Sequence, residues 1–296
     1  MKAIVLKRAG SPDRLALAEV PKPVPESNEV LVRIYATSVV RGDVVMRKVP
    51  RLVARLLGET PRLIPGHEFA GEIEATGENV TVFKIGDRVF GTTSGLTQGS
   101  YAEYLCVPAD GMVAHMPPDV GYEEAAPIPV GAMTALHFLQ AGNVGAGTRV
   151  LINGASGSVG SYAVQIAKRM GAHVTGVAGA SNAELVASLG ADSVIDYSKE
   201  DFTEGAEKYD VIFDAVGKTT ARKTEGGLAE HGRFVSTRKR RREKAEELQA
   251  VQDMVASGAV RALIDRSYTL EQISEAHRYV EGGRKRGNVV VVVAQG

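Results

Sequence analysis

Apolar and polar residues follow two different patterns along this chain, and the change occurs near residue 120. Before that point, short runs of alternating and β-branched residues predict strands at 30–35, 68–73 and 87–90. Glycine and proline separate these runs, and the segment 46–62 is predicted to be a basic, partly helical insertion. The first part of the chain is therefore predicted to be rich in β-structure.

From Gly121 onward, strand-like and helix-like segments alternate. Strands are predicted at 149–153, 173–177, 193–197, 210–214 and 233–236, and helices at 158–170, 182–189, 221–229, 243–257 and 270–280. Such alternation implies parallel strands joined by right-handed crossovers. A last strand, 288–293, carries five consecutive valines, which suits burial on both faces. We expect that strand to return to the first domain and complete its sheet.

These patterns predict an α/β protein with two domains. Residues 1–120, completed by 262–296, are assigned to a β-rich domain, and residues 121–261 to a doubly wound parallel-sheet domain. A chain of 296 residues is long enough to bury a substantial core in this arrangement.

Composition narrows the choice of partners. Lys plus Arg equals Asp plus Glu at 35 each, so no net charge draws the chain to nucleic acid or to an anionic membrane. The basic run 238–242 lacks interleaved aromatic residues and is interpreted as the solvated start of a helix. We find no membrane-length apolar run and no secretory signal, and the single cysteine, Cys106, excludes an internal disulfide. We therefore expect a cytoplasmic protein that acts on a small molecule, with no nucleic acid and no membrane as partner.

The most informative segment is the glycine-rich turn that contains Gly154, Gly157 and Gly160. It follows a predicted strand and opens a predicted helix, which is the context that a dinucleotide fingerprint requires. Glycines there permit the tight turn, the close approach of a pyrophosphate and the close packing of helix on strand. The helix N-terminus adds N–H groups and a favourable dipole for phosphate. The segment therefore predicts a bound nicotinamide dinucleotide.

The end of the second strand of this domain bears on the choice between NADP(H) and NAD(H). NAD enzymes usually carry an acid there for the ribose 2′-hydroxyl, whereas this chain has Ala178-Gly179-Ala180-Ser181. Ser181 is a candidate phosphate contact, with Tyr197 and Lys199 after the next strand. The alternative for Ser181 is the N-cap of the following helix, and the two roles are compatible. NADP(H) is favoured over NAD(H).

Taken together, these segments resemble the medium-chain dehydrogenase/reductase superfamily, on its zinc-free, quinone oxidoreductase-like (zeta-crystallin-like) branch. The resemblance covers almost the whole chain and implies a GroES-like catalytic domain plus a Rossmann domain. It rests on motifs in family order: Pro21–Pro25, Glu29–Val32, Gly66–Gly71, Gly86–Gly91, Gly99–Tyr104, Gly131–Ala135, Ala276–Tyr279 and Arg286–Val290.

The resemblance also implies cofactor-contacting residues. Those implied for the nicotinamide are Thr134, Val216, Gly217, Val235 and Ser236, and those implied for the pyrophosphate are Ser158, Val159 and Asn288. Two of them have a plain structural alternative: Thr134 as an ordinary helix residue, and Asn288 as a turn residue before a strand.

Zinc-dependent relatives hold a catalytic metal with a cysteine, the histidine of Gly-His-Glu and another cysteine or acid. This chain keeps His67, but Val40 stands at the first cysteine position, and the third falls near 127–129, where no residue can ligate. A catalytic zinc needs about three protein ligands, so no metal is predicted. Val40, Asp43 and His67 are the pocket candidates, and no general acid is assigned.

Without a Lewis acid, hydride transfer is best suited to an acceptor that is already electrophilic. We therefore expect NADPH-dependent reduction of a quinone or an α,β-unsaturated carbonyl, in which the protein chiefly positions the reactants. Two alternatives stay open: an alcohol or aldehyde oxidoreductase of the same superfamily, and a nucleotide-binding protein with little turnover.

One departure from the family follows Ser236. Relatives continue through another helix and a strand that pairs with the same strand of a second subunit, whereas this chain passes directly to the basic run 238–242. We therefore expect a monomer, or a homodimer formed through another surface.

Overall fold

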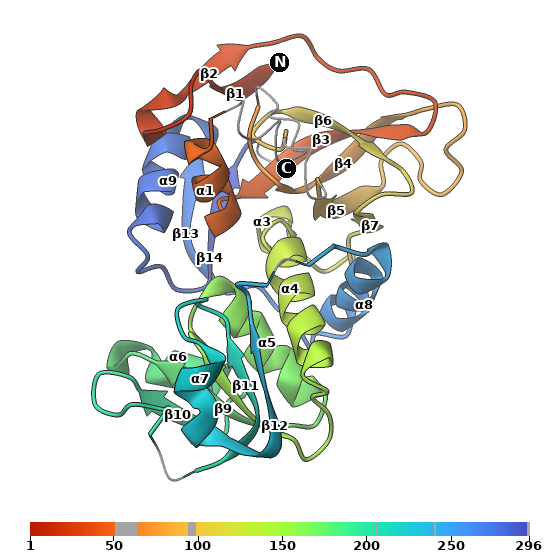
Figure 1. The fold of residues 1–296 in the computed structure, drawn as a ribbon. Helices are drawn as coiled ribbons and strands as arrows, with labels where there is room; N and C mark the ends of the chain where they lie inside the picture. The colour runs from red at the N-terminus through yellow and green to blue at the C-terminus, as the bar shows by residue number, and fades with distance from the viewer. Residues whose placement is uncertain (51–63, 94–98, 205–206, 240, 295–296) are drawn as a thin grey trace. The chain divides into compact units, whose positions relative to one another are not determined.

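The computed structural model describes residues 1–50, 64–93, 99–204, 207–239 and 241–294 (Figure 1). The chain divides into two compact units, which we describe separately. The first contains Met1–Val130, Arg242–Asp253 and Ile264–Gly296, and the second contains Gly131–Arg241 and Met254–Leu263. The division after residue 130 differs from the expected one after 120, because the helix at 122–125 packs on strands of the first unit.

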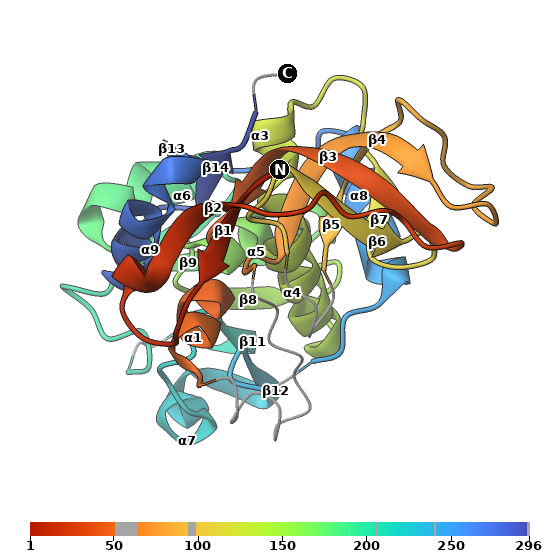
Figure 2. The same ribbon diagram turned by 90° about the horizontal axis from the view of Figure 1, so that it is seen from above.

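The first unit is built mainly on antiparallel strands, with one parallel pair. They are β1 (Lys2–Leu6), β2 (Leu15–Glu19), β3 (Glu29–Ser38), β4 (Glu68–Thr76), β5 (Arg88–Thr92), β6 (Tyr104–Pro108), β7 (Val113–His115), β13 (Ile264–Thr269) and β14 (Asn288–Val292). One sheet has the order β13-β14-β3-β4-β5-β7, with β6 also paired to β3, and β1 pairs with β2 alone (Figure 2). Side chains of Val30, Val32, Ile34 and Phe69 lie in the core of this sheet. The β-rich first domain is therefore confirmed.

The valine-rich strand β14 occupies the predicted place. It runs antiparallel to β3, with Val291 opposite Thr37, and parallel to β13. Val289, Val290 and Val291 have no exposed surface, as expected for a strand covered on both faces.

Among the described residues, the helices that lie wholly within the first unit are short: α1 (Arg41–Lys48), α3 (Tyr122–Ala125) and α9 (Ile273–Glu281), with 3₁₀ turns at Pro12–Arg14 and Leu270–Gln272. Helices α1 and α9 lie side by side (Figure 1). Of the predicted insertion 46–62, the first residues end α1, and 51–62 lie outside the described residues.

The second unit contains a parallel sheet in the order β10-β9-β8-β11-β12. Its strands are β8 (Arg149–Asn153), β9 (His173–Ala178), β10 (Ser193–Asp196), β11 (Tyr209–Asp214) and β12 (Leu228–Ser236). The remaining described helices are α4 (Ile128–Ala141), α5 (Ser158–Arg169), α6 (Ala183–Ser188), α7 (Ala221–Thr224) and α8 (Ala245–Ala256), with 3₁₀ turns at Ala180–Asn182 and Glu225–Gly227; α8 belongs to the first unit up to Asp253. The doubly wound sheet predicted from the alternating pattern is confirmed.

The helix predicted at 221–229 is wrong in its second half. Only Ala221–Thr224 is α-helical, and the chain enters β12 at Leu228. Gly226 and Gly227 stand between the two elements, and consecutive glycines oppose helix continuation. In the described part of the chain β12 is an edge strand, consistent with the absence of the family's following helix and strand.

Within the described residues, the structure contains no helix whose length and apolar character would let it cross a bilayer.

Candidate functional site

The glycine-rich turn connects β8 to α5 and has the shape of a phosphate cradle. Gly154 has φ +82°, and a Cβ there would lie 2.4 Å from Cγ2 of Val216. A Cβ on Gly160 would lie 2.0 Å from the carbonyl oxygen of Gly154, so the helix packs on the turn only if this residue is glycine. These are the turn and packing roles that the fingerprint assigns to glycine.

Gly157, at the N-cap of α5, has the third role of a fingerprint glycine, which is to let a pyrophosphate approach the backbone closely. A Cβ there would meet only the carbonyl oxygen of Gly154, at 3.3 Å, and no described side chain caps this end of the helix. A ligand can therefore approach the backbone where Ser158 and Val159 begin the helix, and where its dipole favours negative charge. The residues present fit a dinucleotide diphosphate.

Asp214 organises the neighbouring loop, and sequence reasoning missed it. Its side chain has no exposed surface. One carboxylate oxygen accepts hydrogen bonds from the backbone N–H groups of Val216 and Gly217, at 3.2 and 3.0 Å, and from the Asn153 amide at 3.0 Å. The other oxygen accepts the N–H of Thr219 at 2.9 Å. The sequence contained one signal that could have identified Asp214: it is an acidic residue at the end of a predicted strand in the same domain as the glycine turn.

The residues implied for the nicotinamide lie at two places in this unit. Ser236, at the end of β12, donates its hydroxyl to Asp214 at 3.4 Å, so it joins Val216 and Gly217 around one carboxylate; Val235 is buried beside it. Thr134 lies in α4 and accepts a hydrogen bond from Nε of Arg241 at 3.2 Å.

The residues considered for the ribose phosphate gather at the ends of β9 and β10. The Tyr197 hydroxyl lies 3.2 Å from where a Cβ of Gly179 would be. Ser181 is exposed and lies in a 3₁₀ turn, and the N-cap of α6 is Asn182, so the helix-cap alternative for Ser181 is wrong. Lys199 is also exposed.

The same corner contains one acid that sequence reasoning did not weigh. The side chain of Asp196, at the end of β10, accepts hydrogen bonds from the backbone and the hydroxyl of Ser198, which lower the pKa of its carboxyl group. Its other oxygen lies 3.9 Å from the Lys199 ammonium. An acid therefore lies at the end of β10, although none ends β9.

The pocket candidates of the first unit lie together. Nδ1 of His67 lies 2.5 Å from one oxygen of Asp43, and the other oxygen accepts the backbone N–H of Val40 at 2.8 Å. Val40 precedes α1, Asp43 lies in its first turn, and His67 immediately precedes β4. The structure therefore brings all three candidates into one hydrogen-bonded group.

Glu68 lies next to this group and is fully buried. Its oxygens accept hydrogen bonds from the Ser38 hydroxyl and, at 2.6 Å, from the backbone N–H of Val130. Burial outweighs these donors and raises the pKa of Glu68 to about 8. The side chain is therefore largely protonated at neutral pH.

These residues do not fit a catalytic zinc. In the described residues no three His, Cys, Asp or Glu side chains come together as metal ligands. Val40, which stands at the position of the first zinc ligand beside His67, has no donor atom on its side chain. Asn288, implied for the pyrophosphate, is the first residue of β14 and is 2% exposed, and its contact with the cofactor stays a prediction.

Family models match most of the chain. The alcohol dehydrogenase GroES-like domain matches residues 26–118, and two models described as zinc-binding dehydrogenase match residues 158–248 and 236–291. The matched ranges correspond to the β-rich sheet and to the second half of the chain.

Individual relatives match over nearly the full length. The chloroplast envelope quinone oxidoreductase homolog of Arabidopsis thaliana is 32% identical and aligns over 92% of each chain. The 2-methylene-furan-3-one reductase of Solanum lycopersicum is 32% identical over 98% of this chain and 79% of its own length. The structure of the quinone oxidoreductase from Coxiella burnetii aligns over 99% of both chains, with a TM-score of 0.85 and 29% identity. This chain therefore belongs to the medium-chain dehydrogenase/reductase superfamily of NAD(P)H-dependent oxidoreductases and is similar to its quinone oxidoreductases.

Proposed function

We propose that this chain reduces a quinone or an α,β-unsaturated carbonyl with a hydride from NADPH, and that it does so without a metal. The observation that carries the proposal is the turn from Gly154 to Gly160, in which Gly154 and Gly160 permit the tight turn and Gly157 leaves the backbone open to a diphosphate at the start of α5. Two relatives support the acceptor class, since one is named as a quinone oxidoreductase homolog and the other as the reductase of an unsaturated furanone.

When bound, NADPH supplies the hydride. The chain's own contribution begins with the backbone at Ser158 and Val159, which holds negative charge at the helix N-terminus. Asp214 then fixes the loop at Val216 and Gly217 by accepting both backbone N–H groups, so that this loop is set before the cofactor arrives. Positioning of this kind is the main source of rate when the acceptor is already electrophilic.

Independence from metal is supported by the surroundings of His67. The positions that carry the other ligands in zinc-dependent relatives hold Val40 and the stretch 127–129, Pro-Ile-Pro, which have no donor side chains. An isolated histidine does not make a catalytic zinc site. A quinone or an enone spreads the charge that a metal would otherwise stabilise.

The preference for NADPH is supported by the end of β9, where Gly179 and Ser181 offer no acid to a 2′-phosphate. The nearby Tyr197 hydroxyl and the exposed Lys199 ammonium suit a phosphate. Asp196 is an opposing group at this corner, and the backbone and hydroxyl of Ser198 engage one of its carboxylate oxygens.

The test compares oxidation of NADPH and NADH with a panel of quinones, enals and simple aldehydes, each with and without a chelator. We expect turnover of quinones or enals, faster with NADPH, and unchanged by the chelator. Turnover of simple aldehydes that the chelator abolishes would overturn both the acceptor class and the metal independence. Faster reaction with NADH would reverse the cofactor assignment, and NADPH binding without any turnover would contradict an enzymatic function.

A further inference from the structure

A hollow in the second unit lies between helix α4 and β12, the last strand of the parallel sheet. Its volume is about 370 Å³, which is within the range of small-molecule sites. Its lining includes His137, Phe138 and Ala141 from α4, Arg233 and Val235 from β12, and Lys239 beyond the strand. All of these residues belong to the second unit, so the hollow can be described within that unit alone.

The register of the sheet explains why β12 presents Arg233 and Val235 to this hollow. In the parallel pair of β11 and β12, Val211 lies opposite Arg233, and Phe213 lies opposite Val235. Residues at paired positions point to the same face of a sheet. Helix α4 covers that face, since the ring centroids of Phe138 and Phe213 are 5.5 Å apart. Arg233 and Val235 therefore lie on the side of β12 that faces the helix.

The hollow lies at the edge of the sheet. Among the described residues, no strand pairs with β12 on the side away from β11. The family pattern places a further helix and strand after Ser236, whereas this chain turns back at once. The backbone N–H of Lys239 donates to the Ser236 carbonyl at 3.1 Å, and the turn that this bond closes puts Lys239 at the hollow. The short connection after β12 therefore supplies part of the lining.

The inner surface of the hollow is apolar and aromatic. Phe138 and Val235 are buried, and the exposed Ala141 adds a methyl group. The partly exposed ring of His137 stands edge-on to Phe138, with ring centroids 5.2 Å apart and an angle of 88° between the planes. Rings in this arrangement favour contact with another flat apolar group.

The outer part of the lining carries positive charge. Arg233 and Lys239 are exposed, and neither forms an ion pair within the described part of the chain. None of the described residues that line the hollow is Asp or Glu. In the amide orientation that satisfies both of its polar atoms, Asn143 accepts hydrogen bonds from Nη1 and Nη2 of Arg233, each at 3.3 Å. A neutral group thus holds the guanidinium, whose charge stays available to a carboxylate.

We propose that this hollow is a binding site for a small anion with a flat apolar body, of the class of aromatic carboxylates. The ring lies against Phe138 and Val235, and the carboxylate accepts hydrogen bonds from Arg233 and Lys239. The two cations oppose a positively charged ligand and favour an anion over a neutral molecule of the same shape. The site is separate from the proposed reaction, because its occupation uses neither NADPH nor a hydride acceptor.

Three probes separate the contribution of the charge from that of the ring: 2-naphthoate, the neutral 2-naphthalenemethanol, and acetate. Each is titrated into the full chain without NADPH, by calorimetry. We expect a Kd for 2-naphthoate on the order of 1 mM or lower, from the usual contribution per ligand atom. The Kd should be at least about fivefold higher for the alcohol, which lacks the charge. Acetate, which lacks the ring, should bind at least about tenfold more weakly than 2-naphthoate.

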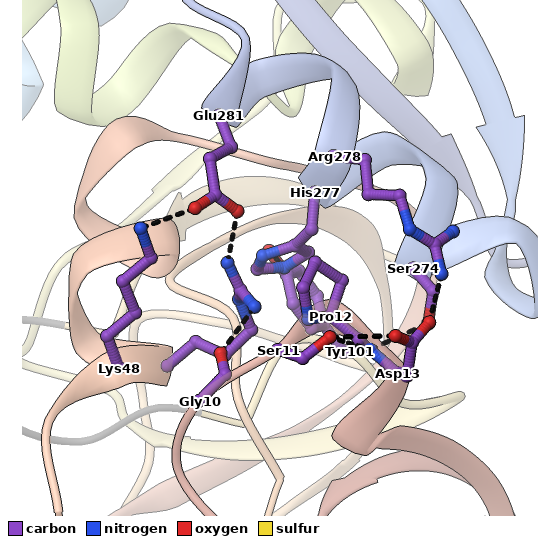
Figure 3. A network of polar contacts seen from close by, with 11 residues as sticks. Gly10, Ser11, Pro12, Asp13, Lys48, Tyr101, Ser274, His277, Arg278 and Glu281 are labelled. Atoms are coloured by element: carbon purple, nitrogen blue, oxygen red, sulfur yellow. Dashed lines mark hydrogen bonds and ion pairs between the residues drawn. The ribbon is translucent and has the colours of Figure 1, made fainter.

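Four variants locate the site. Arg233→Gln and Lys239→Gln each remove one charge and should raise the Kd for 2-naphthoate about fivefold. Ala141→Phe fills the hollow and should abolish binding. The matched control is Lys48→Gln, which also removes one positive charge, but from α1, where Lys48 pairs with Glu281 (Figure 3) and does not line the hollow. This control should bind 2-naphthoate as the wild type does, and melting temperatures show which variants fold.

Three results would overturn the inference. They are a wild type that does not bind 2-naphthoate saturably, equal Kd values for 2-naphthoate and the alcohol, and wild-type affinity in both Arg233→Gln and Lys239→Gln. If Ala141→Phe does not fold, the two charge variants still decide the question. A chain that reduces quinones without binding 2-naphthoate keeps the proposed function and loses this site, and a chain that binds 2-naphthoate at the hollow but reduces no acceptor does the reverse.

Discussion

The Asp214 carboxylate accepts the backbone N–H of Gly217 at 3.0 Å, and this bond links the end of β11 to the loop implied for the nicotinamide. Gly217 has φ +72°, a backbone conformation that favours glycine. The carboxylate is fully buried, so the loop is held by an interaction that water does not weaken.

Replacing Asp214 by Asn should loosen this loop. The amide nitrogen would face either the N–H of Thr219 or those of Val216 and Gly217, so at least one buried donor loses its acceptor, at a cost of about 1–3 kcal/mol. We expect a lower unfolding free energy in urea and a higher Kd for NADPH by fluorescence titration.

Asp210→Asn is the control, because Asp210 is the second residue of the same strand but pairs with Arg149 at the surface. The loss of unfolding free energy in Asp210→Asn should stay below about 1 kcal/mol, and its Kd for NADPH should be unchanged. Equal behaviour of the two variants would contradict the role given to Asp214.

The glycine turn allows folding and binding to be separated. A Cβ on Gly157 meets only a carbonyl oxygen at 3.3 Å, so Gly157→Ala should fold with a melting temperature near that of the wild type. The added methyl group would occupy the approach of the diphosphate, and the Kd for NADPH should rise at least about tenfold, since close backbone approach is the function of this glycine.

Gly160→Ala, unlike Gly157→Ala, should destabilise the fold itself. Its Cβ would lie 2.0 Å from the Gly154 oxygen, so the turn must open, and we expect a loss of roughly 1–3 kcal/mol or more of unfolding free energy, as for other overpacked sites. Gly145→Ala, where a Cβ meets nothing within 4 Å, is the control. A stable Gly160→Ala variant that binds NADPH normally would refute this account of the turn.

Sequence reasoning found the glycine turn because all of its parts are local. A strand, three glycines and a helix follow one another within 149–169, and each signal is visible without knowledge of the fold. The parallel sheet was equally predictable from strand–helix alternation, and so was the return of β14 to β3, since only a doubly covered position suits five valines.

The polar groups could not be predicted in this way, because their members are distant in sequence. Asp43 and His67 are separated by 24 residues, and Tyr101 and His277 by 176. Asp214 gathers donors from β8, from its own loop and from β12. No spacing rule links such residues, and only the packing of α1, α9 and the strands brings them together.

Glu68 should make stability depend on pH in a defined window. Its pKa is about 8 in the folded chain, against 4.5 for an unburied glutamate, so the unfolded chain releases the proton first. Stability from this group is complete below about pH 4.5 and is lost as pH rises toward 8, by an amount on the order of a few kcal/mol. Above pH 8 no further loss is expected.

Glu68→Gln removes this titration while keeping the shape of the side chain. Urea denaturation at pH 5 and at pH 8 should show the variant gaining stability relative to the wild type at the higher pH. A difference between the two proteins that does not change with pH would show that Glu68 is ionised in the folded chain.

The ion pair between Arg47 and Glu281 should matter far more than the one between Lys48 and Glu281. The Arg47 guanidinium is fully buried, whereas the Lys48 side chain is 51% exposed. Arg47→Ala should cost roughly 3–5 kcal/mol, because it removes buried packing and the contacts that join α1 to α9. Lys48→Ala should cost less than about 1 kcal/mol. Similar melting temperatures for the two variants would contradict this difference.

The edge of the second unit's sheet bears on assembly. We propose that β12 does not pair with a second copy, because Glu230 and His231 project from it with about nine-tenths of their side chains exposed, and His231 has φ +67°. Charged residues and irregular backbone at a sheet edge oppose strand pairing. Sedimentation should therefore give a mass near 31.4 kDa, or a dimer that Glu230→Pro leaves intact. A mass of about twice that value which falls to the monomer in Glu230→Pro would show that β12 is the interface, since proline removes a backbone donor from the edge.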